Sequence, residues 1–258
     1  MKINSEDCKI LDNIKMSEDG YVITLKTVKF KDKFSPGNFL QLRCSEENTV
    51  LRRPFSILEE TDGHIKLYFK VVGRGTRRLS NRKSGETVNI IAPLGNSFTV
   101  LAKKRVLLIG GGCGISPLLN LSFFLSKKQS IVDALFGFRN EQDYPKMIVE
   151  NRKRELNNLW ITLDETNKKE YNEGTTIDYL KKINIDMYDA FYCCGPVKMM
   201  EKLSDILKGK WAQVSLEARM GCGIGICYGC SIKTTTGSRR VCSDGPVFNL
   251  NEVIWDEF

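Results

Sequence analysis

The sequence predicts a multi-domain α+β fold, in which an N-terminal antiparallel β-barrel precedes a doubly wound parallel α/β domain and a small cysteine-rich unit. Three observations carry this prediction. Short β-rich runs alternate with turn residues through the first hundred positions, strand and helix patterns alternate from residue 105 onward, and four cysteines crowd into residues 222–242. At roughly 100–200 residues per domain, the chain has room for two domains and an appendage. We therefore expect domains at residues 1–100, 101–214 and 215–258.

The first hundred residues contain four clear strand candidates, rich in β-branched and aromatic residues. They are the runs at 21–25, 39–42, 65–72 and 87–91. Turn-forming residues separate them, as in Ser35-Pro36-Gly37-Asn38 and Thr61-Asp62-Gly63. Several short strands at this spacing are typical of a small barrel or sandwich.

Strand and helix patterns alternate in the middle of the chain. Strands are expected at 105–109, 132–138, 160–163, 189–193 and 213–216, and helices at 116–127, 141–156, 176–182 and 196–208. Such alternation predicts a parallel sheet with helices on both faces.

The cysteine cluster has the spacing C-x4-C-x2-C-x11-C, formed by Cys222, Cys227, Cys230 and Cys242. This spacing is typical of plant-type [2Fe–2S] sites, in which three thiolates come from one loop and the fourth from further along. The interspersed glycines allow the loop to curl tightly around a cluster. A zinc knuckle is the alternative, but zinc ligands usually come as two short paired arms. The spacing therefore favours iron–sulfur.

Two glycine turns follow strands in the α/β domain. The segment Gly110–Pro117 reads GGGCGISP, and glycines before a helix N-terminus let a backbone approach a pyrophosphate. It is not a strict G-x-G-x-x-G, and a turn that only packs a helix on a strand remains an alternative. The second turn, Cys193-Cys194-Gly195-Pro196, also ends a strand, where ligands of open α/β sheets lie. There Cys194 either faces the nicotinamide or fills the core.

A flavin site is suggested by the segment Arg52–Ile57, which reads RRPFSI. An arginine can neutralise a pyrophosphate through its planar fork, the aromatic ring can stack, and the hydroxyl can hydrogen-bond a flavin edge. Nineteen residues after Ser56, the Gly75-Thr76 pair forms a glycine-bearing turn before a short helix. Each segment alone also fits a basic surface hairpin, so the prediction depends on their combination.

The net charge of +8 is spread along the chain, with +5 in residues 1–100, +4 in 101–210 and −1 in 211–258. A nucleic-acid binder would more often show a concentrated basic stripe, so no nucleic-acid partner is expected. No apolar run approaches the ~20 residues that cross a bilayer, and the first residues do not form a signal peptide. We expect a cytoplasmic protein without a membrane partner.

The order of these parts resembles the ferredoxin–NADP reductase superfamily, with an R-x-[FY]-[ST] barrel and a nucleotide domain that ends in C-G-P. The added cysteine cluster makes the chain similar to the electron-transfer subunits of two-subunit, NAD-linked dihydroorotate dehydrogenases. The resemblance covers essentially the whole chain. The segments that carry it are RRPFSI, VVGRGT, PLGNSF, GGGCGISPL, CCGP and SLEARMGCGIGICYGC…VCSDGPVF.

This resemblance implies three cofactor sites. It implies that FAD is held by Arg53, Pro54, Phe55 and Ser56, with Lys70, Val71 and Val72 beside the ring and Gly75 and Thr76 on the pyrophosphate. NAD, the substrate nucleotide, is expected at Gly111, Gly112, Gly114, Cys194, Gly195 and Pro196. The [2Fe–2S] cluster is expected on Cys222, Cys227, Cys230 and Cys242, and no side chain is assigned as acid or base.

The same resemblance implies a partner and a reaction. Electrons would pass between NAD and an FMN-containing catalytic subunit that converts dihydroorotate to orotate, in a heterotetramer, through FAD and the cluster. Two alternatives stay open: the same module serving another partner, such as a hydrogenase or a sulfur- or glutamate-linked flavoenzyme, and a non-enzymatic zinc-binding or redox-sensing protein. The chain departs from the family after Asp164, where a charged loop replaces an expected acidic pair and glycine. Because Arg139 can tolerate a 2′-phosphate, NADP is not excluded.

Overall fold

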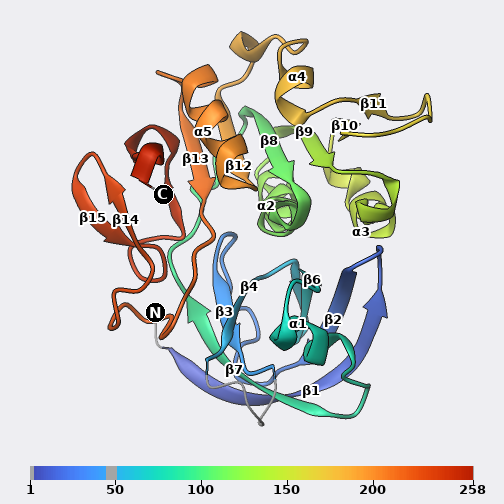
Figure 1. The fold of residues 1–258 in the computed structure, drawn as a ribbon, viewed down its shortest axis with the longest axis vertical. Helices are drawn as coiled ribbons and strands as arrows, with labels where there is room; N and C mark the ends of the chain where they lie inside the picture. The colour runs from blue at the N-terminus through green and yellow to red at the C-terminus, as the bar shows by residue number, and fades with distance from the viewer. Residues whose placement is uncertain (1–2, 45–50, 258) are drawn as a thin grey trace.

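A computed structural model describes residues 3–44 and 51–257, which form two seven-stranded sheets and a two-stranded hairpin (Figure 1). The N-terminal sheet has the strand order β4-β3-β7-β1-β2-β6-β5, and its pairings are antiparallel. Its strands are β1 Asn4–Lys15, β2 Gly20–Lys26, β3 Phe39–Leu42, β4 Arg53–Ser56, β5 Glu59–Thr61, β6 His64–Lys70 and β7 Thr87–Leu94, and helix α1 spans Arg74–Ser80.

The N-terminal sheet curls into the predicted barrel. Phe55 on β4 and Phe69 on β6 are in edge-to-face contact, with ring centroids 5.8 Å apart, although their strands are not neighbours in the sheet. The barrel interior is filled by apolar side chains from every long strand, among them Ile10, Ile23 and Leu40. Burial of these side chains is the main favourable contribution to folding of this unit.

The longest strand of the barrel, β1, was missed by the sequence analysis. Of its twelve residues, only Cys8 and Ile10 are fully buried. The other positions are mostly charged or polar. The alternation of apolar and polar residues that identifies a strand is therefore present only at Cys8 and Ile10. The position of β1 is fixed instead by pairing with β2 on one side and β7 on the other.

The second sheet has the order β11-β10-β9-β8-β12-β13-β16 and is parallel except for the pairing of β16 with β13. Its strands are β8 Arg105–Gly111, β9 Ile131–Phe138, β10 Asn158–Leu163, β11 Asn172–Glu173, β12 Ala190–Cys194, β13 Ala212–Ser215 and β16 Val247–Asn249. The accompanying helices are α2 Ile115–Lys127, α3 Lys146–Glu150, α4 Thr176–Leu180 and α5 Val197–Ile206.

Alternate side chains of β8 enter two different cores, which confirms the predicted doubly wound arrangement. Val106 and Leu108 pack with residues of α2 and α3 on one face. Leu107 and Ile109 pack with residues of α4 and α5 on the other. A strand buried on both faces reads as a continuous apolar run, which is why this element was predicted correctly.

The single helix expected at 141–156 was wrong. This segment contains a 3₁₀ turn at Glu141–Asp143, the short helix α3, and another 3₁₀ turn at Lys153–Glu155. Pro145 explains the break, because proline disfavours helical backbone at the preceding residue. Tyr144 accordingly has an extended conformation, with φ −78° and ψ 113°.

The C-terminal unit contains the hairpin β14 Ser231–Thr234 and β15 Gly237–Arg240, and is joined to both larger units. Asn96, between β7 and β8, donates from Nδ2 to the carbonyl oxygens of Asp244 (3.1 Å) and Val247 (2.8 Å). Its Oδ1 accepts from the Val247 N–H at 2.9 Å, and its own N–H donates to Gly245 at 2.6 Å. Among the described residues, no helix is long and apolar enough to cross a membrane.

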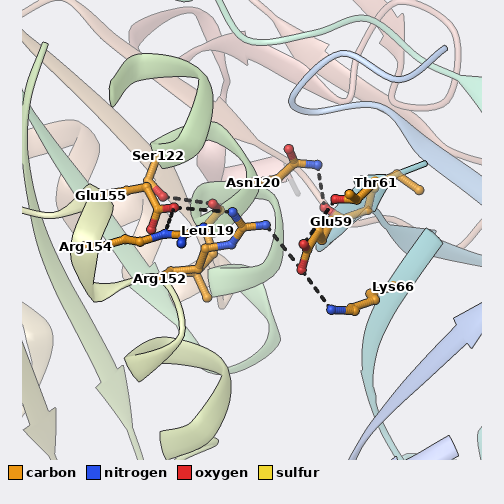
Figure 2. A network of polar contacts seen from close by, with 10 residues as sticks. Glu59, Thr61, Lys66, Leu119, Asn120, Ser122, Arg152, Arg154 and Glu155 are labelled. Atoms are coloured by element: carbon orange, nitrogen blue, oxygen red, sulfur yellow. Dashed lines mark hydrogen bonds and ion pairs between the residues drawn. The ribbon is translucent and has the colours of Figure 1, made fainter. Parts of the chain in front are cut away.

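A polar network at Arg152 connects the barrel with the nucleotide domain (Figure 2). The Arg152 guanidinium is 3.4 Å from the Glu59 carboxylate of β5 and 3.6 Å from Glu155, while Lys66 lies 3.2 Å from Glu59. The Asn120 side chain on α2 adds a hydrogen bond to the Ile57 carbonyl at 3.1 Å. Arg152 and Glu155 are buried, with side-chain exposures of 9% and 6%, whereas the Glu59 side chain is 29% exposed.

Replacing Arg152 with alanine is expected to lower the free energy of unfolding by about 3 kcal/mol, because Glu59 and Glu155 lose a buried partner. Arg154→Ala is the matched control, since Arg154 also pairs with Glu155 but its side chain is 79% exposed. That control should cost at most ~0.5 kcal/mol. Urea denaturation measures both, and equal losses would contradict the assigned role.

The cost of Arg152→Ala should depend on pH. Burial alone would raise the pKa of Glu59, but Arg152 and Lys66 hold it below the ordinary value of 4.5. A lowered folded-state pKa gives stability that is complete above the unfolded-state pKa and is lost as the pH falls through the folded-state pKa. The difference between wild type and variant should therefore stay constant above about pH 5 and shrink as the pH falls from about 5 to about 3. A difference that stays constant over this range would contradict the ionic contribution.

Candidate functional site

The two predicted glycine turns lie against each other at the carboxyl ends of β8 and β12. A Cβ on Gly114 would lie 2.4 Å from the carbonyl oxygen of Cys194, and one on Gly195 would lie 3.0 Å from the Gly111 nitrogen. Only glycine allows these backbones to approach so closely. β8 has β9 on one side and β12 on the other, so this contact lies where the strand order reverses. That point is where open α/β sheets bind ligands.

A cleft of about 430 Å³ opens at this edge of the sheet. Gly111, Gly112 and Pro196, all predicted to contact the nucleotide, line it. Gly112 has φ +54° and open space where a Cβ would lie, so its backbone is accessible to a ligand. Gly114, Cys194 and Gly195 are not part of this lining and lie at the turn-to-turn contact instead.

Cys194 does not face the nucleotide cleft. Its side chain is 1% exposed, and burial raises the pKa of its thiol well above the ordinary value. The thiol is therefore protonated at neutral pH and fills space beneath the glycine turns. Core filling, the second of the two interpretations of Cys194, is therefore correct, and Cys193 is equally buried.

Several residues that line the nucleotide cleft were not identified from the sequence. They are Gly137, Phe138, Asp143, Asp164, Thr175, Thr176, Ile177, Lys198, Met199 and Lys202; the lining also includes Lys70, which was predicted for FAD, and Arg139, which was named as a residue that tolerates a 2′-phosphate. Most follow a strand of the parallel sheet or begin the next helix, so the end of each predicted strand was the available signal. Burial raises the pKa of Asp164, while nearby Arg139 lowers it. This acid–base pair occupies the edge where the sequence departs from its family.

A second cleft, of about 270 Å³, lies between the barrel and the other two units. Arg53, Pro54, Phe55, Ser56, Lys70, Val72 and Thr76 line it, which brings together seven of the nine residues predicted for FAD. The nucleotide domain contributes Cys113, Ser116 and Ser215 at the end of β13, and the segment after β13 contributes Leu216, Glu217, Ala218 and Met220. Burial raises the pKa of Cys113 to about 12, so this thiol is neutral.

The other two predicted flavin residues have different environments. Val71 packs against the barrel core. Gly75 is buried in the first turn of α1, where a Cβ would lie 3.4 Å from the Arg53 Nε atom. This turn is held by Thr76, whose Oγ1 accepts hydrogen bonds from the Val72 and Gly73 N–H groups at 3.0 and 3.2 Å. The Arg53 side chain therefore packs beside Gly75 at the start of α1.

Lys70 belongs to both clefts. Its ammonium group lies 2.5 Å from the Asp143 carboxylate, and only about a fifth of its side chain is exposed. This ion pair joins the end of β6 to the nucleotide domain. The two clefts are therefore adjacent, with one lysine between them.

The cysteine loop follows directly after the segment that lines the second cleft. Two of its glycines, Gly223 and Gly225, have positive φ values of +72° and +85°, which L side chains rarely adopt. Backbone N–H groups point at sulfur: Gly225 donates to Cys242 at 3.2 Å, and Cys227 donates to Cys222 at 3.4 Å. Burial opposes ionisation of Cys222, but the N–H groups of Cys227 and Ile224 lower its pKa to about 6.

The four predicted ligands are arranged as two pairs. The Cys222 and Cys227 thiols interact with each other, and so do the Cys230 and Cys242 thiols. Within the described ranges, no group of three or more His, Cys, Asp or Glu side chains is placed to hold a single metal ion. Two pairs match a two-iron cluster, in which each iron takes two thiolates, better than one tetrahedral zinc.

Comparison with known proteins identifies the family. A family model described as the iron-sulfur cluster binding domain of dihydroorotate dehydrogenase B matches residues 217–254. The chain is 32% identical to the dihydroorotate dehydrogenase B (NAD(+)) electron transfer subunit of Fusobacterium nucleatum, over 98% of this chain and 99% of that protein. It is 33% identical to the protein of that name from Shouchella clausii, over 95% and 96% of the two chains. The chain belongs to this family.

Solved structures agree with this family assignment. A chain of the NADH-dependent reduced ferredoxin-NADP oxidoreductase, studied for flavin-based electron bifurcation, is 28% identical, with a TM-score of 0.87 over 96% of this chain and 90% of that one. The ferredoxin reductase of carbazole 1,9a-dioxygenase has the same fold at 21% identity, with a TM-score of 0.71 over 81% and 67% of the chains. The predicted ferredoxin-reductase architecture is thus confirmed.

The residues of each site fit the group that the family implies. In the second cleft, the Ser116 hydroxyl is 1% exposed and has no hydrogen-bond partner among the described residues, as expected if a ligand supplies one. In the nucleotide cleft, the open backbone at Gly112 suits a phosphate group. In the cysteine loop, the two thiol pairs and their N–H donors suit a [2Fe–2S] cluster.

Gly114→Ala should lower the free energy of unfolding by about 2 kcal/mol, because the new methyl group collides with backbone atoms that cannot easily move. Gly73→Ala is the matched control, since that Cβ would meet nothing within 4 Å and its φ of −173° suits any residue. The control should cost less than about 1 kcal/mol. Urea unfolding compares the two. Similar urea midpoints for the two variants would show that the contact between the glycine turns can accommodate a methyl group, which would contradict the prediction.

Proposed function

We propose that this chain passes electrons between NAD(H) and a partner subunit that carries FMN and oxidises dihydroorotate to orotate in pyrimidine biosynthesis. The proposal rests on one observation: the nucleotide cleft, the second cleft and the cysteine loop lie next to one another in this order. Lys70 is shared by the two clefts, and the segment Ser215–Met220 lines the second cleft and leads directly to Cys222. The names of the relatives, as electron transfer subunits of an NAD(+)-linked dihydroorotate dehydrogenase, support the choice of partner and nucleotide.

The cofactors supply the redox chemistry: FAD exchanges hydride with a nicotinamide and single electrons with a [2Fe–2S] cluster. The chain itself binds and orients them. In this proposal Arg53 neutralises phosphate charge, while Pro54, Phe55 and Ser56 present the β4 surface to the flavin ring. Lys70 lies where flavin and nicotinamide would meet, and its pairing with Asp143 fixes its position.

Nucleotide binding is proposed at the edge formed by the two glycine turns. Gly111 and Gly112 would bind the pyrophosphate through their backbone, with Pro196 packed beside Gly111. Gly114, Cys194 and Gly195 would act indirectly, by keeping the turns in contact. Asp164 at the far end of the cleft favours NAD, because a carboxylate repels a 2′-phosphate, although Arg139 beside it partly offsets this repulsion.

We also propose the domain limits 1–100, 101–214 and 215–258, of which the outer limits 1 and 258 lie outside the described residues. Support comes from the sheets: the barrel strands end at Leu94, the parallel sheet begins at Arg105, and β13 ends at Ser215, one residue beyond the proposed limit, while β16 of the third unit adds an antiparallel strand to this sheet. A cytoplasmic location is proposed because none of the described cysteines forms a disulfide, as is usual in a reducing compartment.

A second candidate is the same module with another partner. It is favoured by the 28% identity to a chain of the NADH-dependent reduced ferredoxin-NADP oxidoreductase, a protein whose name gives ferredoxin rather than dihydroorotate. Co-purification separates the two candidates. An FMN subunit that reduces NAD⁺ with dihydroorotate only when this chain is present supports the first, and capture of a different redox subunit supports the second.

The primary test is a visible absorption spectrum of the anaerobically purified chain before and after addition of NADH. We expect overlapping flavin and iron–sulfur bands that bleach with NADH, because the two clefts are adjacent and the cysteine loop follows the second. The measurement needs no partner. A colourless, zinc-loaded protein would overturn the proposal.

Substitution of one cluster ligand tests the order of the sites. Cys230→Ser removes a ligand that is 4% exposed and lies outside both clefts. Transfer to the partner should fall at least about 100-fold, whereas reduction of the flavin by NADH, followed by stopped-flow absorbance, should change little. Cys113→Ser, in the wall of the second cleft but not a ligand, is the control. Loss of both reactions in a folded Cys230→Ser variant would contradict the proposed order.

A further inference from the structure

Gln41 on β3 is a fully buried polar side chain without a hydrogen-bond partner. Its exposed fraction is 0%, and neither Oε1 nor Nε2 is hydrogen-bonded to any described residue. Leaving a buried amide unpaired costs about 1–3 kcal/mol per group. A side chain in this state is expected to have a partner that belongs to a bound group.

The orientation of Gln41 follows from the alternation of β3. Leu40 and Leu42 point into the barrel core, so Phe39 and Gln41 lie on its outer surface. Phe39 lines the second cleft, as does Pro54, which is the cross-strand neighbour of Gln41 on β4. Gln41 itself does not line that cleft. Gln41 therefore lies beside the second cleft, and its side chain faces a different part of the molecule.

The group that covers Gln41 is the cysteine loop. A Cβ on Gly223 would lie 2.6 Å from Nε2 of Gln41 and 2.7 Å from its Cγ, so the amide lies directly on the Gly223 backbone. In Figure 1 the segment after β13 descends from the nucleotide domain to the barrel near β3. Gly223 immediately follows Cys222, a predicted cluster ligand. Glycine is required there both by this contact and by its φ of +72°.

The amide nitrogen is the group that a cluster at this loop would use. Cluster sulfurs carry negative charge and accept hydrogen bonds, and N–H donors to them are one of the protein's controls on reduction potential. The loop already directs backbone N–H groups to Cys222 and Cys242. Gln41 is a side-chain donor that reaches the same loop from the barrel.

We propose that the Gln41 amide donates a hydrogen bond to a sulfur of the iron–sulfur cluster and thereby raises the cluster's reduction potential. The inference rests on the proposed function, since it needs the cluster to be present. Electron gain makes the sulfurs more negative, so a donor stabilises the reduced cluster more than the oxidised one. Gln41 is thus a positioning and tuning residue that connects the flavin-binding barrel to the cluster.

The test is a dye-mediated redox titration of the full-length chain, purified anaerobically with its cofactors and followed by electron paramagnetic resonance of the reduced cluster. Gln41→Met keeps the length of the side chain but removes the donor. At a fixed potential, the ratio of reduced to oxidised cluster should fall about tenfold in this variant. For a one-electron couple, this fall corresponds to a reduction potential lower by about 59 mV. Gln213→Met on β13 is the matched control and should leave the ratio unchanged, because Gln213 bonds Thr99 away from the loop.

Gln41→His provides the rescue, because the imidazole retains an N–H donor. A ratio near that of the wild type in this variant, together with the fall in Gln41→Met, supports the proposal. An unchanged cluster ratio in Gln41→Met overturns it, as does a shift confined to the flavin. If the methionine variant does not retain a cluster, a lowered ratio in Gln41→His overturns it. A wild-type chain without a cluster signal would instead refute the proposed function.

Discussion

The hydrogen bonds of Asn96 are the constraint on which the arrangement of the three units depends. Asn96 lies in the connection between barrel and nucleotide domain, yet its side chain and backbone are bonded to Asp244, Gly245 and Val247 of the C-terminal unit. The barrel holds the same connection through Asn38, whose amide donates to the Asn96 carbonyl at 2.9 Å. This short segment thus ties the C-terminal unit to the barrel at the point where the chain enters the nucleotide domain, which places the boundaries of all three units close together.

The interface between the barrel and the nucleotide domain combines polar and apolar contacts. Ion pairs and hydrogen bonds surround Arg152 at one place (Figure 2), and beside the clefts Lys70 pairs with Asp143. Val22 and Tyr68 of the barrel share a buried apolar cluster with residues of α2. Apolar burial therefore holds the two units together, while the directional polar contacts fix their relative orientation.

The sequence predicted what is encoded locally. Cysteine spacing, glycine turns after strands and apolar runs each depend on residues close in the chain, so the cluster loop, the two turns and the parallel sheet were identified. What it missed depends on contacts between distant segments. Strand β1 is defined by its neighbours, the Lys70–Asp143 pair joins residues 73 positions apart, and Gln41 and Gly223 become neighbours only when the third unit folds onto the barrel.

The sharing of lining residues gives the sites a linear order. The nucleotide cleft and the second cleft share Lys70, and the second cleft shares the segment Ser215–Met220 with the approach to the cysteine loop. None of the described residues that line the nucleotide cleft belongs to the cysteine loop. A cofactor in the second cleft therefore lies between the nicotinamide, which exchanges two electrons as a hydride, and the cluster, which exchanges one electron at a time. A flavin can do both, so this position suits it. Because Gln41 lies beside this cleft and contacts the loop, the barrel surface that receives the flavin also sets the environment of the next carrier.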